Sequence, residues 1–171
     1  MQPKIPQMKN KIVLIQMFLL LLCGQAIAQK ILLKITGITA AAGEEVKAVD
    51  FKFEGTSTWT TTGLSAGQMK LYPVLIKKAS GLSTHEIYKK VLMGTVFTPN
   101  VELEYYDAAN VMYYKISLVN ALVTNFYWLS PECPTCIQLE HQIAFNPRRI
   151  ETSDVATGIT VKYDYQTKAF Y

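Results

Sequence analysis

The sequence predicts a mainly β domain, arranged as a barrel or sandwich, with one short α-helix. Apolar and polar side chains alternate with a period of two in most stretches between residues 30 and 166, which is typical of half-buried strands. Only residues 81–95 have the spacing of an amphipathic helix. Neither an internal repeat nor a second domain boundary is visible. Residues 29–171 are therefore expected to form a single domain of roughly seven or eight strands.

A targeting segment is expected at the N-terminus. Three lysines, an apolar run and an A-x-A site follow one another: Lys4, Lys9 and Lys11, residues 12–22, and Ala26-Ile27-Ala28. These are the parts of a secretory signal peptide, and the run is shorter than the ~20 apolar residues of a membrane-spanning helix. We therefore expect residues 1–28 to be a signal peptide cleaved between Ala28 and Gln29, which gives a secreted or periplasmic protein.

Two details of this segment remain open, namely whether the true start is Met1 or Met8, and whether Cys23 is lipidated. The lipoprotein alternative is weaker because Leu22 stands where a small residue is wanted. Cleavage would remove three lysines and no acid, lowering the formal net charge from +4 to +1. The basicity therefore belongs to the targeting segment, and we expect neither a nucleic-acid partner nor stable membrane insertion after cleavage.

The strands follow one another with few interruptions. In chain order they are residues 30–36, ending before Gly37, then 46–55, 68–78, 100–107, 111–129, 137–146 and 158–166. In the second of these, Val49, Phe51 and Phe53 are expected to face the core together. In the long strand the alternation slips near Asn120-Ala121, where we expect a bulge or bend.

The predicted helix begins near Ser83 and ends at Gly94. Ser83 and Glu86 have the S-x-x-E spacing of a capping box, in which two backbone donors are satisfied reciprocally. Gly94 stands where a left-handed residue closes a helix. One face of the helix is apolar and the other basic: Ile87, Tyr88, Val91 and Leu92 against Lys89 and Lys90.

Residues 63–67 satisfy the G-x-S-x-G pattern of a nucleophile elbow, with Ser65 at its centre. The chain order Ser65, Asp107, His141 could even mimic a Ser–Asp–His triad. The elbow requires a strand that turns sharply into a helix on a parallel sheet. Here Thr- and Ser-rich sequence precedes it and a strand containing Pro73 follows. We interpret Ser65 as a loop serine.

Cys133-Pro134-Thr135-Cys136 is a C-x-x-C motif. An alternating strand pattern follows it, so the helix N-terminus that would lower a thiol pKa is missing. A zinc site would need two further ligands, for which only His85 and His141 exist. A local disulfide that closes the tip of a hairpin is the favoured interpretation, with free thiols as the main alternative and a thiol or zinc function after that.

The remaining candidates for chemistry have structural interpretations. His141 lies on the apolar side of its strand and is expected to be a packed histidine, whereas His85 is expected to face solvent. Glu102 and Glu104 resemble a carboxylate pair, but a solvated face or cross-strand ion pairs explain them better. We expect no catalytic, cofactor-binding or metal-binding residue, no cofactor and no enzyme activity.

The order of elements resembles the Hcp family, the tube subunits of type VI secretion systems. The features that carry the resemblance are Lys77 or Lys78 at a strand end, Ser83 and Gly94 around the helix, "NVELEYY" at 100–106, "LVNALV" at 118–123, the opening "ILLKITGITAAAGEE" with Gly37 and Gly43, and the closing "ITVKYDYQT". The resemblance covers most of residues 29–171 and implies an Hcp-like two-sheet β-barrel with one short helix.

It also implies a structural protein that packs into a homohexameric ring. Rings of that family stack into a tube, and effector proteins can occupy the pore. The loop that reaches the adjacent ring corresponds to residues 54–68, with Trp59, Leu64 and Ser65 as candidate stacking residues. Ordinary tube subunits have no signal peptide, so export is where this chain departs from the family. A secreted monomeric β-barrel binding module without a type VI role and an envelope thiol protein are the alternative functions.

Overall fold

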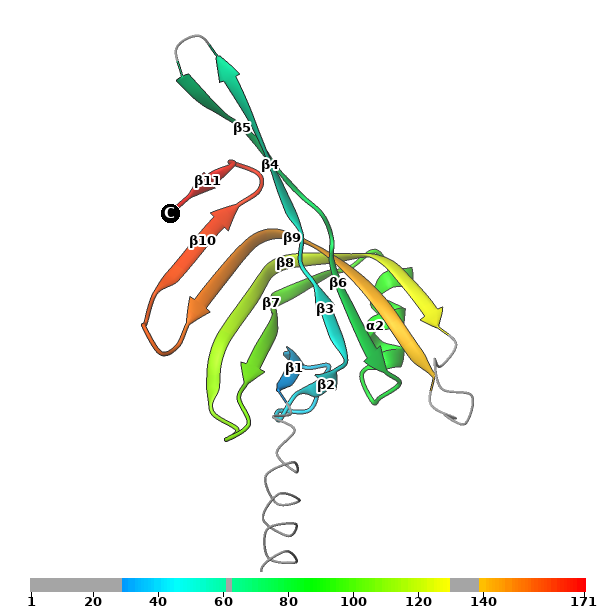
Figure 1. Cartoon of the computed structure of the whole chain (residues 1–171). Coiled ribbons are helices and arrows are strands. Elements are labelled where there is room, and N and C mark those ends of the chain that lie inside the picture. The colour runs from blue at the N-terminus through cyan, green and yellow to red at the C-terminus, as the bar shows by residue number, and fades with distance from the viewer. Residues whose placement is uncertain (1–28, 61–62, 130–138) are drawn as a thin grey trace, which may run out of the picture.

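The computed structural model describes residues 29–60, 63–129 and 139–171, which are mainly β with one short helix (Figure 1). In chain order the elements are β1 (Lys30–Ile35), β2 (Glu44–Val46), β3 (Ala48–Asp50), β4 (Phe53–Thr60), β5 (Gly63–Leu71), β6 (Val74–Ala79), α2 (Thr84–Leu92), β7 (Val96–Tyr106), β8 (Met112–Leu129), β9 (Glu140–Asp154), β10 (Thr160–Asp164) and β11 (Ala169–Phe170). They form a nine-stranded and a two-stranded sheet. The predicted fold class is confirmed. Within the described ranges, no helix has the length and apolarity to cross a membrane.

The nine-stranded sheet curls until its two sides meet. From β8 the order runs through β7 and β1 to β2 on one side, and through β9 and β6 to β3 on the other. β2 and β3 are consecutive pieces of chain separated by Lys47, whose backbone N–H donates to the carbonyl of Lys77 at 2.8 Å. The strands therefore close into a barrel.

β9 is shared by three neighbouring strands. It pairs with β8 over its whole length, and on its other side it pairs first with β6, at residues 140–145, and then with β10, at residues 149–153. Pro147 lies between these two regions, where a residue without an N–H is tolerated. β10 and β11 continue the sheet past the barrel, and we call these two strands the wing (Figure 1).

The core lies on the inner face of the barrel. Its fully buried members come from β1, β6, β7, β8, β9 and α2: Leu33, Val74, Ile76, Ile87, Val101, Leu103, Leu118 and Phe145. The predicted alternation is confirmed in β7, where Val101 and Leu103 point inward while Glu102 lies on the outer face. His141 is completely buried, and His85 is exposed, both as expected.

Residues 46–55 are not the single strand that was expected. β3 pairs with β6 in the barrel, whereas β4 pairs with β5 in the second sheet. Val49 and Phe51 pack against the core, but half of Phe53 is exposed. The expectation is wrong because alternation shows which side of a strand is apolar and not where the chain leaves a sheet.

Residues 54–68, interpreted as a loop, belong to the β4–β5 hairpin, which projects from the barrel (Figure 1). Ser65 is therefore a strand residue and not a loop residue. The strand register shifts between Gly55 and Ser57. β4 contains three threonines, whose branched side chains favour extended backbone over turns.

The bend expected near Asn120-Ala121 is confirmed. Asn120 has a φ of 51°, a left-handed conformation that asparagine adopts more readily than most residues. The register between β7 and β8 shifts between Phe97 and Asn100, directly across from it. A second shift, between Val123 and Asn125, affects the pairing of β8 with β9.

The C-terminal end of α2 agrees with the sequence. Gly94 has a φ of 58°, its N–H donates to the carbonyl of Val91 at 3.0 Å, and the N–H of Thr95 donates to that of Lys90 at 3.1 Å. This pair of bonds is a Schellman motif. Leu92, however, is 71% exposed and does not lie on the buried face with Ile87.

The predicted capping box is wrong. Ser83 is the N-cap residue, but its side chain makes no capping hydrogen bond. Its hydroxyl donates instead to Glu44, a residue of β2. The hydroxyl of Ser83 thus bonds to the carboxylate of Glu44 and not to a backbone N–H of the helix.

Candidate functional site

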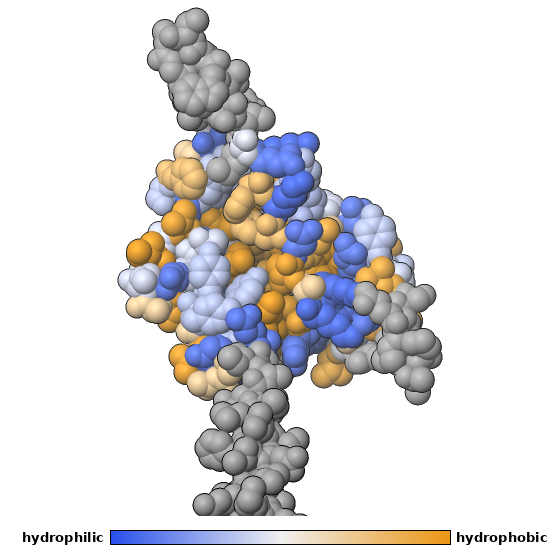
Figure 2. All heavy atoms as spheres, in the orientation of Figure 1, coloured by the Kyte–Doolittle hydropathy of each residue, from blue (hydrophilic) through white to orange (hydrophobic). Residues whose placement is uncertain are grey.

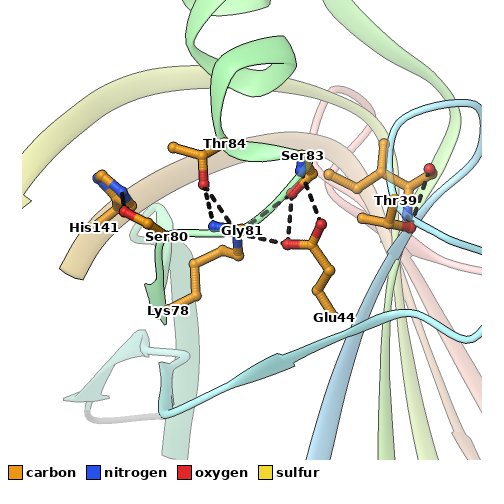
Figure 3. A network of polar contacts seen from close by, with 9 residues as sticks. Thr39, Glu44, Lys78, Ser80, Gly81, Ser83, Thr84 and His141 are labelled. Carbon is orange, nitrogen blue, oxygen red and sulfur yellow. Dashed lines mark hydrogen bonds and ion pairs between the residues drawn. The ribbon is translucent and has the colours of Figure 1, made fainter. Parts of the chain in front are cut away.

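A buried ion pair joins β2 to β6 beneath the start of α2 (Figure 3). Lys78 Nζ lies 2.6 Å from Glu44 Oε2, and only 1% of the lysine side chain and 15% of the glutamate side chain are exposed. The backbone N–H of Ser83 donates to Glu44 Oε1 at 2.9 Å and its hydroxyl donates to Oε2 at 2.7 Å. Both carboxylate oxygens are thus engaged.

The ammonium group of Lys78 also has hydrogen-bond partners besides Glu44. Lys78 Nζ donates to the hydroxyls of Ser83 and Thr84, each at 3.3 Å. Burial acts to raise the pKa of Glu44, but the hydrogen bonds from Lys78 and Ser83 outweigh it and hold the pKa below its usual value. A β-carbon at Gly81 would lie 2.9 Å from Glu44 Oε2, so the loop also needs its glycine. The charged and hydroxyl groups of this cluster therefore satisfy one another.

Ser80 and His141 form a second polar contact beside this cluster (Figure 3). Ser80 Oγ lies 2.6 Å from His141 Nε2, while Nδ1 is buried without a hydrogen-bond partner among the described residues. A proton on Nε2 leaves a bare acceptor at Nδ1, which costs less than an unpaired N–H. In that tautomer the histidine donates its N–H to the serine hydroxyl.

The outer face of β1, β7 and β8 carries diagonal ion pairs. Lys34 Nζ lies 2.7 Å from Glu104 Oε2, and Lys115 Nζ lies 2.7 Å from Glu102 Oε1. The hydroxyl of Tyr106 also donates to Glu104 at 2.6 Å. Burial acts to raise the pKa of Glu104, but the bonds from Lys34 and Tyr106 lower it overall. These glutamates are cross-strand partners, as expected, and not an acid–base pair.

The apparent triad does not assemble. Ser65 lies in β5 opposite Thr58, Asp107 accepts the N–H of Val111 in the β7–β8 turn, and His141 is held by Ser80. Figure 1 shows these three places on different sides of the molecule. No cluster of metal-ligating side chains occurs in the described parts of the chain. Cys133, Cys136 and residues 1–28 lie outside those parts, so the disulfide and the signal peptide stay predictions. Gln29 is the first described residue and is exposed.

An apolar hollow of about 230 Å³ opens where the wing leaves the barrel. It is lined by Phe51, Phe53, Ile150, Thr152, Val161, Tyr163 and Phe170. Figure 2 shows apolar side chains gathered on this face of the molecule, with hydrophilic ones around them. Among the described residues, the inner side of the sheet thus continues past the barrel without a covering layer.

The base of the β4–β5 hairpin is fixed by a cluster around Tyr72. Its hydroxyl donates to Glu54 at 2.6 Å, and the ammonium groups of Lys52 and Lys70 lie 4.9 and 4.8 Å from the centre of its ring. Further out, Trp59 stands opposite Leu64 in the strand register. The candidate stacking residues therefore share one end of a projecting hairpin.

Neither the role of Glu44 nor the burial of Lys78 was expected from the sequence. One signal was available for the lysine, because Lys78 continues the spacing of Val74 and Ile76, which places all three on the inner side of β6. A lysine on that side needs a buried carboxylate, and several glutamates could have supplied it. The pairing of β6 with β3 brings Glu44, at the start of the preceding strand β2, close to Lys78.

Comparison with known proteins places these features in context. The profile of a family described as "Type VI secretion system effector, Hcp" matches residues 34–153. Among solved structures, Hcp1 from Salmonella typhimurium aligns with a TM-score of 0.69 at 18% identity, covering 84% of this chain and 99% of that protein. Hcp1 from E. coli EAEC 042 aligns with a TM-score of 0.66 at 20% identity, covering 82% and 100%.

A secreted protein from Pseudomonas aeruginosa, Hcp3, has the same fold at lower similarity. Its TM-score is 0.53 at 19% identity, and the alignment covers 81% of this chain and 99% of that protein. A comparison with the sequences of curated proteins gave no match.

Proposed function

The chain belongs to the Hcp family of type VI secretion proteins, and on this premise we propose that it is a non-enzymatic tube subunit that assembles into a hexameric ring. The observation that carries the proposal is the extent of the family match, residues 34–153, which runs from the last two residues of β1 through nearly all of β9 and contains the whole of β2 to β8. The uncovered apolar side chains of the wing support self-association, because large exposed apolar patches usually mark contact sites.

The proposal assigns the projecting hairpin to ring stacking. Two-stranded hairpins are marginally stable in water unless they pack against something, and β4 and β5 pair only with each other among the described strands. The tip, with Trp59, Leu64 and Ser65, would contact the adjacent ring. Small effector proteins would occupy the pore of the stacked rings.

Export forms a separate part of the proposal. Cleavage after Ala28 would leave a single domain that begins at Gln29, directly before β1. An oxidising compartment would then favour a disulfide between Cys133 and Cys136. The mass of the protein purified after expression of the full chain tests this: it should correspond to residues 29–171, two hydrogens lighter before reduction than after. A mass that includes residues 1–28 would contradict export.

The first experiment on assembly is light scattering over a concentration series, with and without reductant. A mass six times that of the chain supports the ring, and stacked particles by electron microscopy would support the tube. A monomeric mass at all concentrations would contradict the proposed hexameric ring. Assembly that is lost on reduction, or in a Cys133→Ser/Cys136→Ser variant that remains folded, would favour the envelope thiol protein.

One observation favours a second candidate function, a secreted monomeric β-barrel that binds an apolar ligand. The hollow between Phe53 and Phe170 is open and almost entirely apolar. If the protein is monomeric, an apolar fluorescent probe should bind there, and a Val161→Lys substitution should abolish the binding. A monomer that binds no probe would argue against this candidate as well.

A further inference from the structure

The outer side of α2 is an exposed surface of mixed apolar and basic character. His85, Tyr88, Lys89, Leu92 and Met93 follow the i, i+3, i+4, i+7, i+8 spacing that places side chains on one face of a helix. This face lies away from the buried Thr84 and Ile87, and Leu92 and Met93 are 71% and 66% exposed. We call these five residues the helix surface.

A second exposed apolar surface lies at the β7–β8 and β9–β10 turns. Its apolar members are Val111, Val155 and Ile159, and its charged members are Asp107 and Asp154. The backbone N–H of Val155 donates to the carbonyl of Tyr113 at 3.0 Å, which holds the two turns side by side. We call these five residues the turn surface.

The two surfaces differ in charge and lie on opposite sides of the molecule. The turn surface has two carboxylates, and neither residues 107–114 nor residues 153–161 include a lysine or arginine. In the helix surface the charged side chain is Lys89; Glu86 and Lys90 of α2 lie outside it, and their charges offset one another. Figure 1 shows α2 on one side of the barrel and the two turns on the other. Opposite charges on two exposed apolar surfaces favour their contact with each other.

We propose that the helix surface of one copy of this chain docks on the turn surface of the next copy. This inference rests on the proposed self-assembly and adds the surfaces that would carry it. A contact between two different surfaces is head-to-tail, and it closes into a ring when the rotation between subunits permits. Because both complementary surfaces belong to this one chain, a second copy satisfies both, with each copy donating one surface and accepting the other.

The test is a charge exchange in the protein purified after expression of the full chain. The helix variant carries His85→Glu and Lys89→Glu. The turn variant carries Asp107→Asn and Asp154→Asn, which keep the Oδ1 acceptors that bind the N–H groups of Val111 and Thr157, together with Ala108→Lys and Ala156→Lys at exposed positions. Circular dichroism and thermal unfolding verify that each variant is folded.

Each variant alone should remain monomeric under conditions in which the native chain is hexameric. A 1:1 mixture should recover the six-fold mass with the two variants alternating, because every contact then joins an acidic to a basic surface. A matched control, Glu45→Lys with Asp50→Lys, shifts the net charge by the same amount as the turn variant at exposed positions outside both surfaces, and it should assemble like the native chain.

Two results would overturn the inference. Folded variants that assemble alone as well as the native chain would show that these surfaces are not in contact, and folded variants that stay monomeric when mixed would show that charge complementarity does not operate there. A monomeric native chain would instead remove the proposed function itself, so the two failures are distinguishable.

Discussion

Lys78 and Glu44 form an ion pair in which the lysine is almost completely buried, with Nζ 2.6 Å from Oε2 and 1% of the side chain exposed. The pair connects β2 to β6 where the two sides of the barrel meet, and Ser83 connects it to the start of α2. Barrel closure and helix docking therefore depend on the same carboxylate.

Glu44→Gln should lower the free energy of unfolding by about 3–5 kcal/mol, because it leaves the ammonium group of Lys78 buried without its counter-charge. Urea unfolding measures this loss. The matched control is Glu54→Gln, which removes a carboxylate 2.7 Å from Lys52 at an exposed site and should change little. Equal effects of the two substitutions would mean that burial of the Lys78 pair does not matter.

Ser83→Ala should cost about 2 kcal/mol, the range for a hydrogen bond to a charged group and more than loss of an ordinary cap. The cost arises at Glu44, so it should shrink when the substitution is made in a Glu44→Gln background. A double-mutant cycle by urea unfolding tests this coupling. Additive effects would contradict it and return Ser83 to the role of a simple N-cap residue.

The free energy of unfolding should fall as the pH is lowered from 7 to 5, because of His141. Burial, then the charge of Lys78, then His85 lower the pKa of His141, so the unfolded chain binds this proton at a higher pH than the folded one. The stability is present above the unfolded pKa of about 6.5 and is lost as the pH falls toward the folded pKa.

The chain has two histidines, which gives this prediction an internal control. His141→Gln should flatten the pH dependence between pH 7 and 5, whereas His85→Gln, at an exposed position, should retain most of it. Urea unfolding at each pH is the measurement. A native protein with constant stability over this interval would contradict the assignment.

Gly94→Ala should destabilise the protein by about 1 kcal/mol, since Gly94 has a φ of 58° that a residue with a β-carbon adopts at a cost. The space around it is open, so strain in the backbone is the whole effect. Gly55→Ala is the control, because Gly55 has an ordinary φ and equally open surroundings. Thermal unfolding of the two variants should separate them.

The strands could be predicted from the sequence wherever one face of the strand is buried and the other is exposed to solvent. Val101 and Leu103 in β7, and Ile116 and Leu118 in β8, give the period of two directly, and Gly94 and Asn120 mark left-handed positions through their own chemistry. These signals depend only on residues close together in the chain, so they can be recognised in a single sequence.

What could not be predicted depends on partners that are distant in the chain. Lys78 is buried because Glu44 meets it from another strand, and Ser83 leaves its cap position for the same carboxylate. The division between β3 and β4 depends on which strand each segment pairs with, and the side-chain pattern near Phe53 does not encode that choice.

The sharing of β9 between barrel and wing sets the order of events during synthesis. β6 and β8 both hydrogen-bond to β9, so until residues 140–154 have left the ribosome, the strands made earlier keep two unpaired edges. Such edges are templates for pairing with other chains. The nascent chain therefore keeps these two edges exposed until most of it has been made.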